Sequence, residues 1–194
     1  MVGPFRRSKY GNTHLLVAVD KFTKWDEAEP VSKCDAATTL KFLKNISFRF
    51  GYPHSIITDN GSNLSEGVME AFSIKEHIRL DLTSVAHPQS NGQAERANQE
   101  LLHGIKPRLC VLLIRMSGCW VEELSSVLWS IRTTPNRSTG FTPFFLVYGS
   151  GAVLPSDIRH DSPRVTAYVE ADNEEARQNS LDVLYEKWEL AASK

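Results

Sequence analysis

Short apolar runs separated by polar turns mark the beginning of the chain. His14–Val19 reads HLLVAV, a continuous apolar run that is typical of a strand covered on both faces. The polar and basic stretch Arg6–Asn12 predicts a turn before that strand. Met1–Phe5 is then expected to be the tail of an earlier strand, and Phe22–Pro30 a third strand. The pattern predicts a hairpin or meander at the start of a sheet.

A helix is expected next. Asp35 has the short polar side chain that favours the N-cap position. The sequence Gly51-Tyr52-Pro53 stops the helix after Arg49. Between these two signals, the apolar residues that recur at helical spacing are Ala36, Leu40, Leu43, Ile46 and Phe50.

Short strands and helices alternate in the following segment. We expect a strand over Ser55–Thr58 that ends on Asp59, a helix over Gly67–Phe72 and another short strand over Asp81–Val85. Alternation of this kind is typical of an α/β sheet that is covered by helices.

The second half of the chain predicts helices. Apolar residues recur at helical spacing from Ala94 to Leu112, and Pro107 is expected to kink or divide that helix. A second amphipathic helix is predicted over Trp120–Ile131, a loop over Pro135–Pro143 and a charged helix over Asn173–Ala191.

The order of elements favours an α/β fold. We expect a mixed sheet whose first three strands are antiparallel, followed by alternating strands and helices, with helices flanking the sheet. A C-terminal helical extension completes the chain. The expected division is a core domain at residues 1–160 and a linker with a C-terminal helix at residues 161–194.

Composition and charge narrow the class of protein. The 194 residues are 41% hydrophobic and 23% charged, which suits one ordinary domain with a short extension. A formal net charge of -1 argues against strong independent DNA binding, but it leaves room for a local basic patch. The 3 cysteines lack zinc-knuckle spacing and predict free thiols. Without a membrane-length apolar run or a signal peptide, we expect the nucleus or cytoplasm and no membrane partner.

Two polar segments carry the candidate chemistry. The first is Thr58-Asp59-Asn60-Gly61-Ser62, where a carboxylate follows a buried strand. Ligands of open α/β sheets bind at that carboxyl edge. In the second, the sequence predicts that the loop His87–Gly92 leads into a helix whose first turn holds Glu95 and Arg96. Phosphodiester chemistry commonly uses two divalent metals that acidic side chains hold, so acids from separate elements suit a metal site.

Each segment also has a structural interpretation. Asp-Asn-Gly is common in turns, and an early helical Glu often offsets the helix dipole. Their combination on these elements favours the functional interpretation.

The chain resembles the integrase catalytic core of gypsy-class LTR retrotransposons, which belongs to the retroviral integrase superfamily. The motifs that carry the resemblance span residues 1 to 160 and read MVGPF, LLVAVDKFTKWDEAEP, FGYPHSIITDNGSN, VAHPQSNGQAERANQELL and VLWSIRTTPNRSTGFTPFFLVYGSGAVLP. The resemblance implies a ribonuclease-H-like fold and DNA integration by 3′-end processing and strand transfer. Cores of this family use two aspartates and a glutamate with 35 residues between the last two, and 35 residues (60–94) separate Asp59 from Glu95.

Site residues follow from the resemblance, residue by residue. Asp59 corresponds to the second catalytic, metal-binding acid and Glu95 to the third, with Mg²⁺ or Mn²⁺ as the expected cofactor. The partners implied are DNA, both the element's ends and its target, and a second copy of the chain; no small-molecule substrate is expected. The residues expected to contact nucleic acid are Asn60, Gln89, Ser90, Asn91, Gln93, Arg96 and Gln99.

The family's first acid precedes the segment that reads MVGPF here, and that segment begins at Met1. We therefore expect the 194-residue polypeptide to bind one metal weakly and to be inactive or severely impaired. Asp20 aligns after the second strand, so its expected role is to end that strand or to cap a turn.

Two further hypotheses come from other classes. The chain is a non-catalytic nucleic-acid-binding or protein-binding remnant of an integrase if its fold persists without metal chemistry. A ribonuclease-H-type nuclease would need a fourth acid and a basic surface for hybrids, and the sequence places neither. Loss of metal binding in an Asp59→Asn variant separates a metal-dependent core from a binding remnant.

Overall fold

The computed structural model describes residues 2–59, 67–83, 120–167 and 169–192. These residues form two compact units. The first comprises residues up to Val19 and from Asp26 to Leu128, and the second comprises Asp20–Trp25 together with Trp129–Lys194. None of the helices in the described part of the chain is long and apolar enough to span a membrane.

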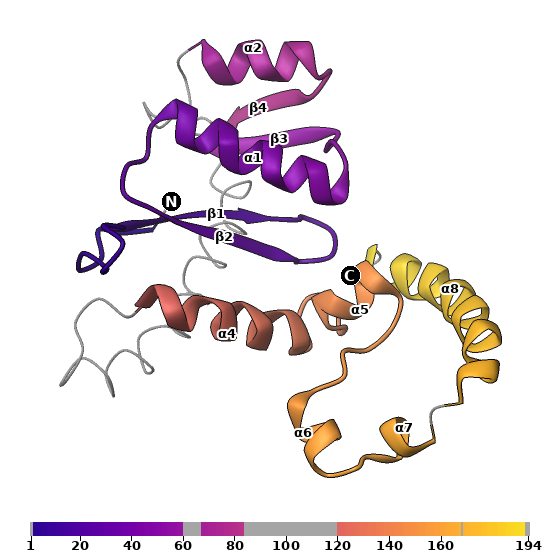
Figure 1. Cartoon of the computed structure of the whole chain (residues 1–194). Coiled ribbons are helices and arrows are strands. Elements are labelled where there is room, and N and C mark those ends of the chain that lie inside the picture. Colours follow the sequence, from indigo (N-terminus) through magenta and orange to yellow (C-terminus); the bar gives the residue numbers. More distant parts are fainter. Residues whose placement is uncertain (1, 60–66, 84–119, 168, 193–194) are drawn as a thin grey trace. The chain divides into compact units, whose positions relative to one another are not determined.

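Strands β1 (His14–Val19) and β2 (Asp26–Val31) form an antiparallel hairpin in the first unit (Figure 1). Leu16 lies opposite Glu29, and Val17 opposite Ala28. The first strand has the predicted bounds. The second begins four residues later than the predicted Phe22, because residues 21–23 form a turn.

The segment before β1 pairs with it at a single position. Val2 and Leu15 form an isolated antiparallel bridge, in which the backbone N–H of each donates to the carbonyl oxygen of the other at 2.9 and 2.8 Å. The expected strand tail at Met1–Phe5 is thus reduced to one bridge within the described residues. The turn predicted at Arg6–Asn12 is present.

Helix α1 (Ala36–Phe50) begins and ends at the predicted signals. The Asp35 carboxylate accepts a hydrogen bond from the backbone N–H of Thr38 at 2.8 Å. At the other end Gly51 adopts a φ of 87°, which a glycine tolerates without strain. Its predicted apolar stripe needs correction. The buried residues are Thr39, Phe42 and Ser47, whereas Phe50 is 44% exposed.

The cap on α1 makes the stability of the protein depend on pH. The hydrogen bonds from Thr38 hold the pKa of Asp35 below its usual value of 3.8 in the folded state. Because the pKa of Asp35 is lower in the folded state than in the unfolded state, the ionised carboxylate stabilises the folded protein above pH 3.8. This stabilisation is lost as the pH falls through the pKa of the folded state. We expect Asp35→Ala to lower the urea midpoint at pH 7, and the gap from the wild type to narrow below pH 3.8. An equal gap at both pH values would contradict this explanation.

The apolar core of the first unit includes Leu16 of β1, Val31 of β2 and Phe42 of α1. Cys34 and Ile46 are partly buried against this cluster. Cys34 is a free cysteine, and burial raises the pKa of its thiol. Helix α1 therefore packs on the hairpin through residues that the chain brings together from three separate elements.

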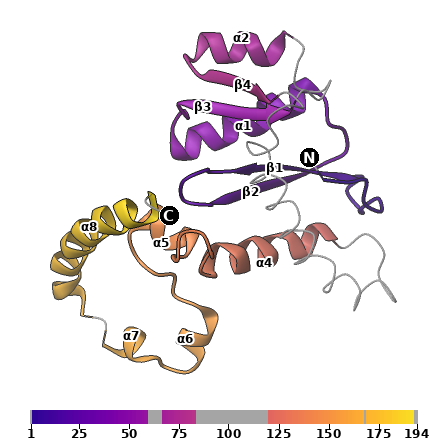
Figure 2. The same cartoon turned by 180° about the vertical axis from the view of Figure 1, so that it is seen from behind.

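Strands β3 (Ser55–Asp59) and β4 (Arg79–Thr83) form a parallel pair, with helix α2 (Val68–Lys75) between them in the chain (Figure 2). Parallel strands need such a crossover. Helix α2 is longer than the predicted helix at Gly67–Phe72, and β4 starts two residues before the predicted Asp81. The mixed α/β class is confirmed, with one antiparallel and one parallel pair among the described residues.

The rest of the described chain is helical. The predicted helix at Trp120 is α4 (Trp120–Thr133), and the predicted charged helix is α8 (Glu170–Ala192). Three short helices between them were not predicted. They are α5 (Pro143–Tyr148), α6 (Pro155–Arg159) and α7 (Pro163–Thr166).

Contacts between α5 and α8 hold the second unit together. The indole N–H of Trp188 donates to the carbonyl oxygen of Leu146 at 3.0 Å, and both Leu146 and Leu184 are buried. Gly149 ends α5 in a left-handed conformation, with a φ of 73°. A methyl group at this glycine would lie 3.3 Å from Leu184, so a side chain here would press on α8.

Candidate functional site

Asp59 is the last residue of β3, as predicted. It lies opposite Thr83, the last residue of β4, in the parallel register. Ile56 and Ile57 precede it opposite Leu80 and Asp81. Because two parallel strands end at the same place, Asp59 lies at the carboxyl edge of this pair, where α/β sheets commonly bind ligands.

The other predicted site residues lie outside the described residues. These are Asn60, Gln89, Ser90, Asn91, Gln93, Glu95, Arg96 and Gln99. The convergence of Asp59 with Glu95 therefore stays a prediction. Within the described ranges, no three or more His, Cys, Asp or Glu side chains gather in a group that could hold a metal ion.

Asp20 caps the turn that follows β1. Its Oδ2 accepts hydrogen bonds from the backbone N–H of Thr23 at 2.8 Å and from the Thr23 hydroxyl at 2.6 Å. The backbone N–H of Asp20 also donates to the carbonyl oxygen of Trp25 at 2.9 Å, which closes the turn. The turn-capping role expected from the sequence is confirmed.

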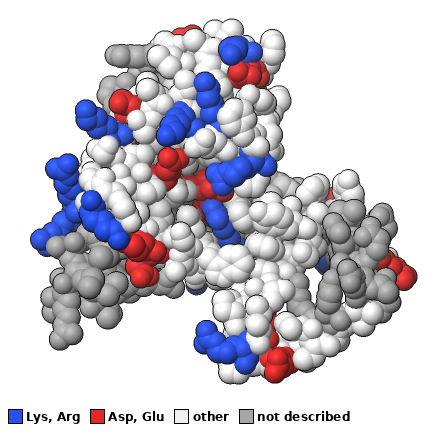
Figure 3. Space-filling model, in the orientation of Figure 1, with Lys and Arg blue, Asp and Glu red and all other residues white. Residues whose placement is uncertain are grey.

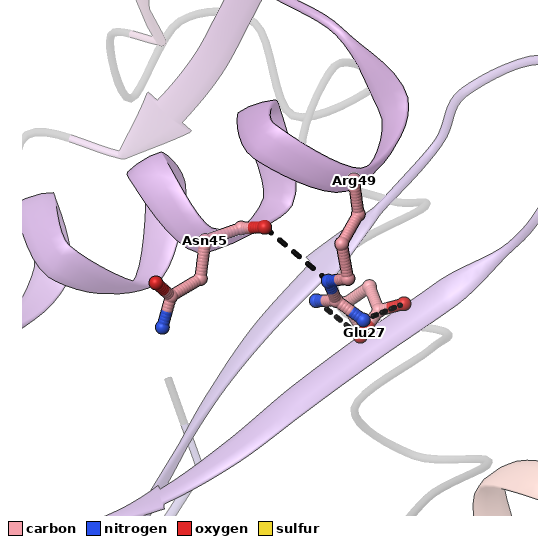
Figure 4. Close-up of polar contacts among 3 residues, drawn as sticks. All are labelled: Glu27, Asn45 and Arg49. Atoms are coloured by element: carbon pink, nitrogen blue, oxygen red, sulfur yellow. Dashed lines mark hydrogen bonds and ion pairs between the residues drawn. The ribbon is translucent and has the colours of Figure 1, made fainter.

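Glu27 is a buried acid that the sequence did not single out (Figure 4). Its carboxylate accepts two hydrogen bonds from the Arg49 guanidinium, at 3.2 Å from Nη1 and 3.1 Å from Nη2. Arg49 also donates from Nε to the carbonyl oxygen of Asn45 at 3.2 Å. This planar two-bond geometry joins β2 to α1. We therefore assign Glu27 to the packing of the first unit rather than to the candidate metal site.

A known protein family matches the part of the chain that contains both strand pairs. Residues 2–88 match the family model of the integrase core domain. The matched segment includes both strand pairs, α1 and α2, and Asp59 lies within it.

Retroviral polyproteins are similar to most of the chain. The Gag-Pol polyprotein of gibbon ape leukemia virus is 37% identical over 161 residues, which are 78% of this chain and 9% of the polyprotein. The Pol polyprotein of radiation murine leukemia virus (strain Kaplan) is 32% identical over 187 residues, which are 95% of this chain and 31% of that protein. The chain thus spans less than a third of either relative.

Two solved structures share the fold. The simian T-cell lymphotropic virus intasome in complex with PP2A regulatory subunit B56 gamma superposes with a TM-score of 0.63 at 21% identity, covering 77% of this chain and 52% of that one. The HTLV-2 integrase catalytic core domain in complex with magnesium gives a TM-score of 0.57 at 18% identity, covering 74% of this chain and 97% of that one.

These matches agree on one class of protein, although they extend over different parts of the chain. The fold is that of an integrase catalytic core. Residues 2–88 match the integrase core domain, and the similarity to retroviral polyproteins extends over 78% to 95% of the chain in the two relatives described.

Proposed function

We propose that this chain is the catalytic core of the integrase of a gypsy-class LTR retrotransposon, acting in DNA integration. In the intact core, Asp59 and Glu95 would bind divalent metal for 3′-end processing and strand transfer. The observation that carries the proposal is the parallel strand pair ending on Asp59, inside the segment that matches the integrase core domain. Its location would be the nucleus or cytoplasm.

The donor chemistry of the proposed residues fits a hard divalent cation. Mg²⁺ prefers carboxylate oxygens and water, and Asp59 and Glu95 supply carboxylates. When bound, such an ion polarises a phosphoryl oxygen and stabilises the charge that develops during displacement. The HTLV-2 integrase catalytic core that shares this fold was determined in complex with magnesium.

The chain's own residues would position the DNA. Asp59 ends a paired strand, which places its backbone at the carboxyl edge of the parallel pair. The polar residues Asn60, Gln89, Ser90, Asn91, Gln93, Arg96 and Gln99 would bind the DNA and hold it in line with the attacking hydroxyl group. Holding two reacting groups in this geometry lowers the barrier by removing the entropy cost of bringing them together.

DNA and a second copy of the chain are the proposed partners. One structure with this fold is an intasome, and the HTLV-2 integrase catalytic core is known in a trimeric and a dimeric form. These assemblies support the proposal that this chain also forms oligomers.

Metal binding tests the proposal. We expect Mn²⁺, used as a paramagnetic stand-in for Mg²⁺, to bind the wild-type chain weakly in a titration followed by electron paramagnetic resonance. Asp59→Asn should abolish this binding, because it replaces one anionic ligand by a neutral amide. Asp20→Asn is the matched control and should bind Mn²⁺ as the wild type does, since Asp20 caps a turn. Equal binding by Asp59→Asn and the wild type would favour the non-catalytic binding protein.

A further inference from the structure

Three basic residues gather on the turn that precedes β1. This basic turn, residues 6–12, carries Arg6, Arg7 and Lys9, and all three are exposed. It contains no acidic residue. Figure 3 shows one of several groups of blue side chains over the loop before β1, with red side chains beside it. A concentration of positive charge in a chain whose net charge is -1 marks a local anion-attracting surface.

The backbone of the basic turn is held in one conformation by Ser8, which is buried. The Ser8 hydroxyl oxygen accepts hydrogen bonds from the N–H groups of Tyr10 at 3.2 Å and Asn12 at 3.1 Å. The Ser8 N–H donates to the carbonyl oxygen of Asn12, and the Gly11 N–H donates to that of Ser8, each at 2.9 Å. The basic side chains therefore project from a closed turn rather than from a loose arm.

The basic turn is also fixed to helix α4. The ring of Phe5 stacks on that of Trp120, with centroids 4.8 Å apart. The indole N–H of Trp120 donates to the carbonyl oxygen of Arg6 at 2.8 Å. These contacts hold the backbone at Arg6 while leaving its side chain in solvent, an arrangement that reduces the entropy lost when a ligand binds.

The three cations are not equivalent. Lys9 forms an ion pair with Glu122 at 2.6 Å, and this hydrogen bond raises the pKa of Lys9 to about 12. Arg6 and Arg7 form no ion pair among the described residues. The Arg7 guanidinium lies beside Gly11, where a methyl group would be 3.7 Å from Nη2. Within the parts of the chain that the structure describes, both guanidinium groups are therefore open to an external anion.

We propose that the basic turn contacts the phosphate backbone of duplex DNA through Arg6 and Arg7. Guanidinium groups match the geometry of phosphate oxygens and bind them through paired hydrogen bonds. Tyr10 lies on the same surface and is 65% exposed, with its ring centroid 4.9 Å from Lys9 Nζ. Contacts of this kind position a protein on DNA without reading its sequence. The choice of DNA rests on the proposed function.

DNA binding as a function of salt tests this proposal. The wild-type chain is titrated into a fluorescein-labelled duplex of about 30 base pairs, and Kd is measured by anisotropy from about 50 to 200 mM salt. We expect Arg6→Ala/Arg7→Ala to bind about tenfold more weakly at the lowest salt concentration, and the slope of log Kd against log salt to fall by about 2.

Matched variants separate this surface from a general effect of charge. Arg137→Ala/Arg159→Ala makes the same charge change at two exposed arginines of the second unit, and it should bind as the wild type does. Arg6→Lys/Arg7→Lys keeps the charge and should retain most of the salt slope. If the alanine variant does not fold by circular dichroism, Arg6→Gln/Arg7→Gln replaces it with side chains that keep their hydrogen-bonding capacity.

Each other outcome contradicts the proposal. Equal affinities for the wild type and both double alanine variants, or an equal loss in both variants, would overturn the assignment of this surface while leaving the integrase function intact. A loss confined to an RNA duplex of the same sequence would assign the surface to RNA. No DNA binding by the wild type would remove the DNA-binding part of the proposed function as well. Arg6→Ala/Arg7→Ala is expected to bind Mn²⁺ as the wild type does, so a failure of this surface can be told apart from a failure of the proposed metal site.

Discussion

Asp59→Asn is expected to reduce strand transfer by about a hundredfold or more. A metal held at the reacting phosphate contributes several kcal/mol of transition-state stabilisation, and each ~1.4 kcal/mol corresponds to a factor of ten in rate. The substitution preserves the shape of the side chain but removes the negative charge. The rate is measured by joining a labelled element-end duplex to a plasmid in Mg²⁺ or Mn²⁺. The polypeptide for this assay carries one aspartate added before Met1, where the family's first acid is expected.

Asp20→Asn is the matched control for strand transfer. It makes the same chemical change at an aspartate whose carboxylate accepts two hydrogen bonds from Thr23, and an asparagine oxygen can still accept them. We expect its rate to stay within about twofold of the parent polypeptide. A larger loss in Asp20→Asn than in Asp59→Asn would make Asp20 the better candidate for the catalytic acid.

Trp120→Ala is expected to destabilise the first unit by about 3–5 kcal/mol, the usual range for a large buried aromatic residue replaced by alanine. Trp120 is 1% exposed, stacks on Phe5 and donates a hydrogen bond to the carbonyl oxygen of Arg6. The substitution removes the stack and the hydrogen bond together and leaves a cavity. Urea unfolding followed by circular dichroism measures the change in the free energy of unfolding.

Two variants show which contact of Trp120 matters. Trp120→Phe keeps an aromatic ring beside Phe5 but leaves the Arg6 carbonyl oxygen without its donor, so we expect a smaller loss of about 1–3 kcal/mol. Trp129→Ala makes the same substitution as Trp120→Ala on the same helix, at a side chain that is 39% exposed, and should also cost less. A free-energy loss under about 1 kcal/mol in Trp120→Ala would mean that this contact does not hold the turn against α4.

Local sequence signals predicted helices and strands where neighbouring residues alone determine them. Asp35 caps α1 and Gly51 ends it as expected, because a cap needs only the neighbouring backbone groups. The apolar run His14–Val19 is a strand with the predicted bounds. The short helices α5, α6 and α7 escaped prediction, since four to six residues carry too little periodicity to show one.

Burial of charged and polar side chains depended on distant residues. Glu27 was a member of a predicted strand with no assigned role, and its carboxylate is buried because Arg49, 22 residues later, reaches it. The predicted apolar stripe of α1 was wrong at Phe50, because the hairpin packs on Phe42 through Leu16 and Val31 instead. An apolar pattern shows which residues favour burial, but it does not show which face the neighbouring elements cover.

The candidate site, too, was determined partly by the sequence and partly by the tertiary structure. The sequence alone determined that an aspartate ends a strand at Asp59, that Glu95 is 36 positions later, and that the surrounding motifs resemble an integrase core. The predicted burial of that strand was wrong, because Ile57 is 39% exposed. Only the tertiary structure decided that β3 and β4 are parallel and end together at Asp59 and Thr83. It also decided that Ser8 and Trp120 fix the turn that presents Arg6 and Arg7. The physical reason is that local propensity acts through adjacent residues, whereas strand pairing and surface presentation depend on contacts between residues far apart in the chain.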